Sequence, residues 1–225
     1  MAIKTPNGDF ILCKSCSKEI NSNSVFCNFC GSKVKADTET NAISLKDYIK
    51  RKGKLSFRES INITLLILQE LKGAHQIGVI HRMICPNVIY ITIEGKVQVR
   101  EFERYSNLYS GCSESKIEEH TIYSPPEFPK ESELNEQSDL FSVGMVLYEM
   151  LNGSTPRGSL DLKEGLLKMP KSVEGIILKC LHSNLEDLYG NCQELEVDLR
   201  KALQNPEETI VIIDEGAYPD VLDIY

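Results

Sequence analysis

The sequence predicts a mainly α-helical (α+β) domain with one β-hairpin and a small cysteine-rich piece at the N-terminus. Two capping-box starts, Ser44 with Asp47 and Ser56 with Glu59, each predict a helix. Residues 138–153, SDLFSVGMVLYEMLNG, are apolar on most sides and indicate a helix buried in the centre of the domain. Residues 88–102, VIYITIEGKVQVREF, alternate in the β-branched manner of a hairpin.

The remaining pattern sets the order of these elements. The first helix ends at Gly53 and the second runs on to Gly78, with apolar residues at helical intervals. Residues 94–95, Glu-Gly, mark the hairpin turn, and the polar residues 103–121 predict a long surface loop. Two further helices are expected over residues 173–181 and 192–203.

Composition and charge divide the chain. Its 225 residues are 41% hydrophobic and carry a formal charge of −8; residues 1–36 account for about +3 and the remainder for about −11. An acidic main domain argues against nonspecific binding of nucleic acid.

No apolar run is long enough to span a membrane and no signal segment is evident, so we expect a cytoplasmic protein without membrane contact. The expected parts are residues 1–35, a linker over 36–43, a domain over 44–204 and an acidic tail over 205–225.

Four cysteines near the N-terminus have the spacing of a metal site. They form two C-x-x-C pairs ten residues apart, and two such turns can supply four thiolates in tetrahedral geometry: Cys13, Cys16, Cys27 and Cys30. Two disulfides or unbound thiols are the alternative, which the absence of secretory features disfavours. The stretch FCNFCGSKV resembles the short zinc ribbons of bacterial multidomain proteins. Four cysteines leave no open coordination position, so the expected Zn²⁺ is structural.

Residues 44–204 resemble the C-terminal lobe of a protein kinase. The motifs occur in the family's order: His81-Arg82 lie where the His-Arg-Asp motif begins, and residues 101–103 lie where Asp-Phe-Gly is found. Residues 124–127 lie near Ala-Pro-Glu, and residues 139–144 match Asp-x-Trp-x-x-Gly. The resemblance implies that His81 and Asp139 connect the loop to the buried helix. It also implies that Arg82 and Glu127 serve the activation segment, although Leu188 stands where Glu127 would find an arginine partner.

Several positions depart from the family's motifs. The proton-accepting Asp, the phosphate-contacting Lys and the amide that helps to hold magnesium are all replaced, and so are the first and last residues of Asp-Phe-Gly: Met83, Cys85, Val88, Glu101 and Glu103. No G-x-G-x-x-G loop or V-A-I-K-like strand lies between Cys30 and His81. These departures predict a protein that is not an enzyme and binds neither ATP nor Mg²⁺.

The function expected from these features is that of a catalytically inactive kinase-like protein, a pseudokinase acting as a signalling scaffold or regulator through protein partners. One alternative is a zinc-ribbon nucleic-acid adaptor that uses the lysines at 14, 18, 33 and 35. Another is an atypical kinase subunit completed by a partner chain. In the tail, Thr209 follows two acidic residues in a pattern resembling phosphothreonine ligands of forkhead-associated domains. A forkhead-associated domain is therefore one expected partner.

Overall fold

The computed structural model describes residues 3–5, 8–13, 16–21, 42–102, 121–125, 134–182 and 184–207. Helix α1 spans Leu45–Lys52 and α2 spans Phe57–His75. Each begins as the capping pattern predicts, since the Ser44 hydroxyl accepts the backbone N–H of Asp47 and the Ser56 hydroxyl accepts that of Glu59. The expected helical starts are therefore confirmed.

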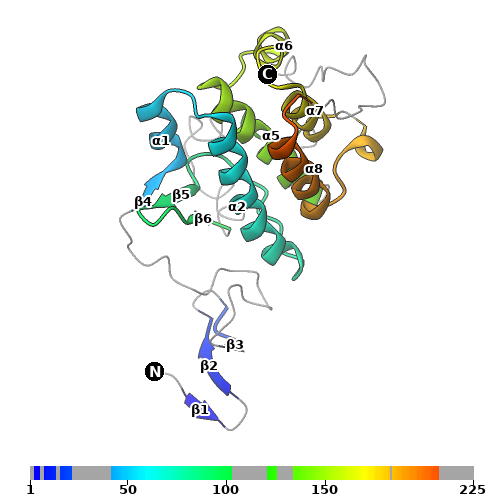
Figure 1. The fold of residues 1–225 in the computed structure, drawn as a ribbon. Coiled ribbons are helices and arrows are strands. Elements are labelled where there is room, and N and C mark those ends of the chain that lie inside the picture. The colour runs from blue at the N-terminus through cyan, green and yellow to red at the C-terminus, as the bar shows by residue number, and fades with distance from the viewer. Residues whose placement is uncertain are drawn as a thin grey trace.

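A three-stranded antiparallel sheet packs beside these helices. Strands β4 (Ala42–Ser44), β5 (Ile89–Thr92) and β6 (Val97–Val99) follow one another in space, with Ile43 opposite Ile91 and Ile91 opposite Val97. Strands β5 and β6 form the predicted hairpin, and Gly95 at φ 74° occupies a turn conformation that a side chain disfavours. The sheet contacts α1 and α2 (Figure 1).

Helix α5 (Glu136–Asn152) is the centre of the helical domain. Asn135 and Ser138 form a reciprocal capping box at its start, and Gly153 ends it in the left-handed conformation at φ 87°. Every residue from Ser138 to Met150 is buried, as the apolar sequence predicts. Helices α7 (Lys171–Cys180) and α8 (Cys192–Gln204) complete the packing: α7 lies against α5, and α8 lies against α2 and α7 (Figure 1).

A second antiparallel sheet forms near the N-terminus. Strands β1 (Ile3–Thr5), β2 (Gly8–Leu12) and β3 (Glu19–Asn21) pair in that order. Between β2 and β3, Ser17 donates its N–H to the Cys13 carbonyl, and Cys13 donates its N–H to the carbonyl of Lys18. Cys13 and Ile20 are buried together, with Cys16 packed against them. Cys13 and Cys16 are the first of the two predicted C-x-x-C pairs.

The elements that were not predicted include a strand and a helix of the main domain. Ala42–Ser44, placed partly in the expected linker, is a strand because β5 offers it a free edge of alternating apolar residues. Helix α6 (Ser159–Leu166) was missed, since its sequence has no side-chain cap and a mixed pattern.

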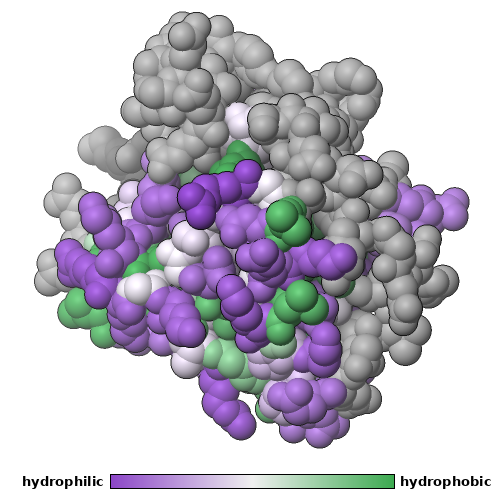
Figure 2. Space-filling view, turned by 90° about the horizontal axis from the view of Figure 1, so that it is seen from above, coloured by the Kyte–Doolittle hydropathy of each residue, from purple (hydrophilic) through white to green (hydrophobic). Residues whose placement is uncertain are grey.

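Among the described helices none is long and apolar enough to cross a membrane. In the coloured part of Figure 2 the surface is largely hydrophilic, with hydrophobic groups separated from one another.

Candidate active site

The Asp139 carboxylate holds the loop that carries His81 and Arg82. One oxygen accepts the backbone N–H of Arg82 at 2.7 Å, and the other accepts that of His81 at 2.9 Å. Asp139 is fully buried in α5, where an unsatisfied carboxylate would be costly. These hydrogen bonds satisfy it and fix the backbone of the loop against the most buried helix of the domain.

The imidazole of His81 ties the loop to the strand that precedes Glu101. Its Nε2 lies 2.9 Å from the Arg100 carbonyl, and its Nδ1 accepts the N–H of Met83 at 3.3 Å. Burial lowers the pKa of His81, so the ring is neutral, with the proton on Nε2 as these partners require. The ring also packs against Phe102, with centroids 4.5 Å apart. His81 therefore joins residues 81–83 to residues 100–102.

Two residues of this joined pair of loops have a strained backbone. Arg82 and Glu101 both have φ 68°, a conformation that is uncommon for residues with long side chains. Such conformations cost about 1–3 kcal/mol each and persist where the surrounding structure imposes them, often at functional sites. Here the hydrogen bonds of Asp139 and His81 impose them, and Glu101 presents its side chain at the exposed surface.

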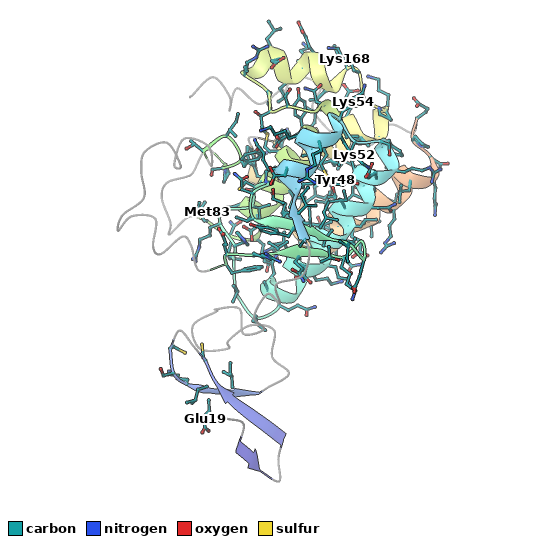
Figure 3. All side chains as sticks on the ribbon, turned by 90° about the vertical axis from the view of Figure 1, so that its left-hand side faces the viewer. Glu19, Tyr48, Lys52, Lys54, Met83 and Lys168 are labelled. Atoms are coloured by element: carbon teal, nitrogen blue, oxygen red, sulfur yellow. The ribbon has the colours of Figure 1, made fainter. Side chains whose placement is uncertain are left out.

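Three of the substituted positions are buried. Met83 is 4% exposed, and Cys85 and Val88 are each 1% exposed. Cys85 and Val88 belong to the main hydrophobic core, and Val88 accepts the N–H of Arg100 at 2.8 Å through its carbonyl. Figure 3 shows Met83 at the margin of the helical domain, away from Tyr48 and Lys52 on α1. Cys85 and Val88 thus stabilise the loop by packing in the hydrophobic core.

His75 belongs to this network, and sequence reasoning did not single it out. Its Nε2 lies 2.8 Å from the Asp139 carboxylate. Burial alone lowers the pKa of His75, but the hydrogen bonds and charges of Asp139 and Cys192 outweigh it and raise the pKa to about 10. A histidine on the apolar face of a helix, four residues after Leu71, was the signal that could have found it.

A second unpredicted contact anchors residues 121–125. The hydroxyl of Tyr123 donates to Glu149 of α5 at 2.5 Å, and both side chains are buried. Lys46 of α1 lies 3.5 Å from the other oxygen of the same carboxylate. Glu149 therefore ties the end of this segment to the central helix. Tyr123 directly precedes the motif at residues 124–127, and this position in the sequence was the signal that could have found it.

Five predicted site residues lie outside the described residues: Cys27, Cys30, Glu103, Glu127 and Thr209. Within the described ranges, no group of three or more His, Cys, Asp and Glu side chains could hold a metal ion. The expected structural zinc therefore gains no support from the described part of the chain. The domain boundaries, the partner domain for Thr209 and the roles of Arg82 and Glu127 stay predictions.

Comparison with known families identifies the class of the domain. The family described as the protein kinase domain matches residues 26–205. This span is most of the chain, so the chain belongs to the protein kinase domain family. The kinase domain of PknI from Mycobacterium tuberculosis has the same fold, with a TM-score of 0.56 at 16% identity over 73% of this chain and 63% of that one.

Several bacterial serine/threonine-protein kinases are similar in sequence. A probable serine/threonine-protein kinase of Clostridium perfringens is 29% identical over 74% of this chain, and PrkC of Bacillus subtilis is 28% identical over 71%. PknB of Mycobacterium leprae is 27% identical over 76%. The matched region spans 27%, 27% and 31% of the lengths of these three relatives.

These findings correct the functional expectation from sequence. The prediction of a non-enzymatic pseudokinase scaffold that binds neither ATP nor Mg²⁺ is contradicted by membership of the kinase family and by relatives named as serine/threonine-protein kinases. The prediction treated the combined loss of these side chains, together with the missing G-x-G-x-x-G and V-A-I-K-like motifs, as decisive. Phosphoryl transfer depends largely on positioning and electrostatics, and the backbone frame that provides positioning is intact around Asp139 and His81.

Proposed function

We propose that this chain acts as a serine/threonine protein kinase that transfers the γ-phosphoryl group of ATP to a protein hydroxyl. The observation that carries the proposal is the loop frame: Asp139 holds residues 81 and 82, and His81 holds residues 100–102, so that Arg82 and Glu101 keep strained conformations. A frame that stores strain at two adjacent loops supports a catalytic role. The similarity to named serine/threonine-protein kinases gives the reaction and the class of hydroxyl.

Glu101 is the residue that we assign to the metal ion. Mg²⁺ is commonly bound through one or two carboxylates together with substrate phosphates, and Glu101 offers an exposed carboxylate at the joined loops. Val88 is apolar and buried, so it supplies no second side-chain oxygen. The residues therefore fit a site in which one carboxylate and the phosphates share the ion. When bound, Mg²⁺ neutralises charge that develops on the phosphates.

The remaining residues orient this carboxylate and do not react. His81 fixes the carbonyl of Arg100 immediately before Glu101, and Phe102 immediately after it is buried against the same ring. Met83 offers no oxygen to accept a proton from the hydroxyl substrate. General base catalysis typically contributes about 10²–10⁴-fold, so we expect slow transfer compared with an enzyme that has a carboxylate there.

The test is a phosphoryl-transfer assay with the purified chain, radiolabelled ATP, Mg²⁺ and a serine-rich basic protein as acceptor. We expect slow incorporation of label on serine or threonine, and its loss in Glu101→Gln. Glu94→Gln, a change at an exposed carboxylate on the hairpin turn, is the control and should keep the wild-type rate. Label that never exceeds the Glu101→Gln background, with the protein folded, would refute the proposal.

A further inference from the structure

A buried cluster on the far side of Asp139 contains a thiol next to an imidazole. Cys192 Sγ lies 3.5 Å from Nδ1 of His75, and Nε2 of the same ring lies 2.8 Å from Asp139. The three residues come from α8, α2 and α5. The order thiol, imidazole, carboxylate is the arrangement by which proteins activate a cysteine nucleophile. The proposed phosphoryl transfer makes no use of this thiol.

The geometry points to Cys192 as a site of oxidative modification, at which the thiolate reacts with a small hydroperoxide to form a sulfenic acid. Asp139 fixes the ring so that Nε2 bears a proton toward it and Nδ1 faces the sulfur. A protonated His75 then stabilises the thiolate across the 3.5 Å contact. This inference goes beyond the proposed kinase function and does not depend on it.

The sulfur also lies at the start of a helix. Cys192 is the first residue of the 13-residue helix α8, whose N-cap Asn191 accepts the N–H groups of Gln193 and Glu194. The partial positive charge of a helix N-terminus stabilises a thiolate. Glu136 faces the same edge of the ring, with its carboxylate 3.8 Å from Nδ1 of His75.

The same glutamate shows how a small reagent reaches the cluster. The Cys192 residue is 3% exposed and the His75 side chain 4%, but the Glu136 side chain beside them is 40% exposed. The cluster therefore contacts a partly exposed side chain, and Gly190, two residues before Cys192, is exposed. A molecule of the size of hydrogen peroxide needs only a small local opening at the start of α8, where helix ends fray most readily.

The chemical step balances without another reactant. The thiolate sulfur attacks one oxygen of the hydroperoxide, so an S–O bond forms while the O–O bond breaks. Sulfur is oxidised to the sulfenic acid, and the second peroxide oxygen is reduced and leaves as hydroxide or alkoxide. His75 donates a proton from its imidazolium to this leaving group, which departs as water or an alcohol.

The experiment is treatment of the full chain with hydrogen peroxide in the presence of dimedone, which traps sulfenic acids, followed by peptide mass spectrometry. Cys180 is the internal control: it is equally buried, burial raises the pKa of its thiol, and no imidazole is among its neighbours that shift it. We expect Cys192 to be labelled about tenfold or more faster than Cys180. Equal labelling of the two cysteines would overturn the inference.

One variant tests the role of the cluster. His75→Gln keeps an N–H donor toward Asp139 but removes the cation that faces the sulfur, so labelling of Cys192 should fall about tenfold; an unchanged rate contradicts the inference. The comparison of Cys192 with Cys180 in the unmodified chain keeps the inference falsifiable if His75→Gln fails to fold.

Discussion

The imidazole of His75 and the carboxylate of Asp139 meet at 2.8 Å, and both side chains are buried. Asp139 also accepts the N–H groups of His81 and Arg82, so one carboxylate joins α2, α5 and the candidate catalytic loop. The stability of the helical domain and the geometry of its site are therefore coupled through a single side chain.

Replacing Asp139 by Asn should destabilise the fold strongly. The charge of His75 would lose its partner, and removal of one member of a buried pair typically costs about 3–5 kcal/mol. Chemical denaturation followed by circular dichroism measures this free energy of unfolding. Glu136→Gln, at the partly exposed neighbour of the same histidine, is the control and should change it by about 0.5 kcal/mol or less. Equal effects of the two changes would show that the buried contact contributes little.

The pH dependence of stability should report the same pair. The pKa of His75 is raised to about 10 in the folded protein from about 6.5 in an unfolded chain. Its contribution is thus fully present below pH 6.5 and is lost as the pH rises through about 10. Unfolding free energies measured from pH 6 to pH 10 should decline with a slope of up to about 1.4 kcal/mol per pH unit. In His75→Gln this decline should be weaker, and parallel curves would assign it to other groups.

A carboxylate restored at position 83 should accelerate phosphoryl transfer. Met83 stands in the loop where a general base contributes typically about 10²–10⁴-fold, so Met83→Asp should raise the rate of label transfer by about 10²-fold. The matched control is Met83→Leu, which conserves the apolar character and volume and should leave the rate unchanged. A rate that stays at the wild-type level in a folded Met83→Asp variant would place the proton acceptor elsewhere.

The bond between Tyr123 and Glu149 should matter more than a similar bond near the surface. Tyr48 donates to Glu59 at the same 2.5 Å, but Glu59 has 28% of its side chain exposed, whereas Glu149 has 4%. Tyr123→Phe leaves a buried carboxylate short of a donor, at a cost of about 1–3 kcal/mol, while water can replace the hydroxyl in Tyr48→Phe. Thermal unfolding of both variants gives the comparison, and a larger loss in Tyr48→Phe would contradict it.

Close packing between α5 and α7 gives another test. A methyl group added at Gly144 would overlap the Cβ of Cys180, whereas one added at Gly73 of α2 meets nothing within 4 Å. Gly144→Ala should therefore destabilise the domain by about 1–3 kcal/mol. Gly73→Ala should stabilise it by up to about 1 kcal/mol, because alanine favours the helix. Denaturant midpoints of the two variants should move in opposite directions; an unchanged or raised midpoint in Gly144→Ala would contradict the overlap.

Local patterns in the sequence determined the helical starts, the hairpin and the buried central helix. Ser44 and Ser56 cap through residues three positions away, and the turn at Gly95 needs only its own backbone freedom, so each signal is contained in a short segment. The same is true of the mostly apolar run that becomes α5. The order of the motifs was enough to indicate the kinase-like fold.

Tertiary structure decided which side chains meet. Nothing in the sequence pairs His75 with Asp139 and Cys192, or Tyr123 with Glu149, because these partners are separated by 64, 117 and 26 positions and are brought together only by helix packing. Likewise, the substituted residues at 83, 85 and 88 indicated lost chemistry, whereas the fold shows that the surrounding backbone frame is kept. Hydrogen bonds between distant segments hold that frame, and the residue types at single positions do not predict those hydrogen bonds.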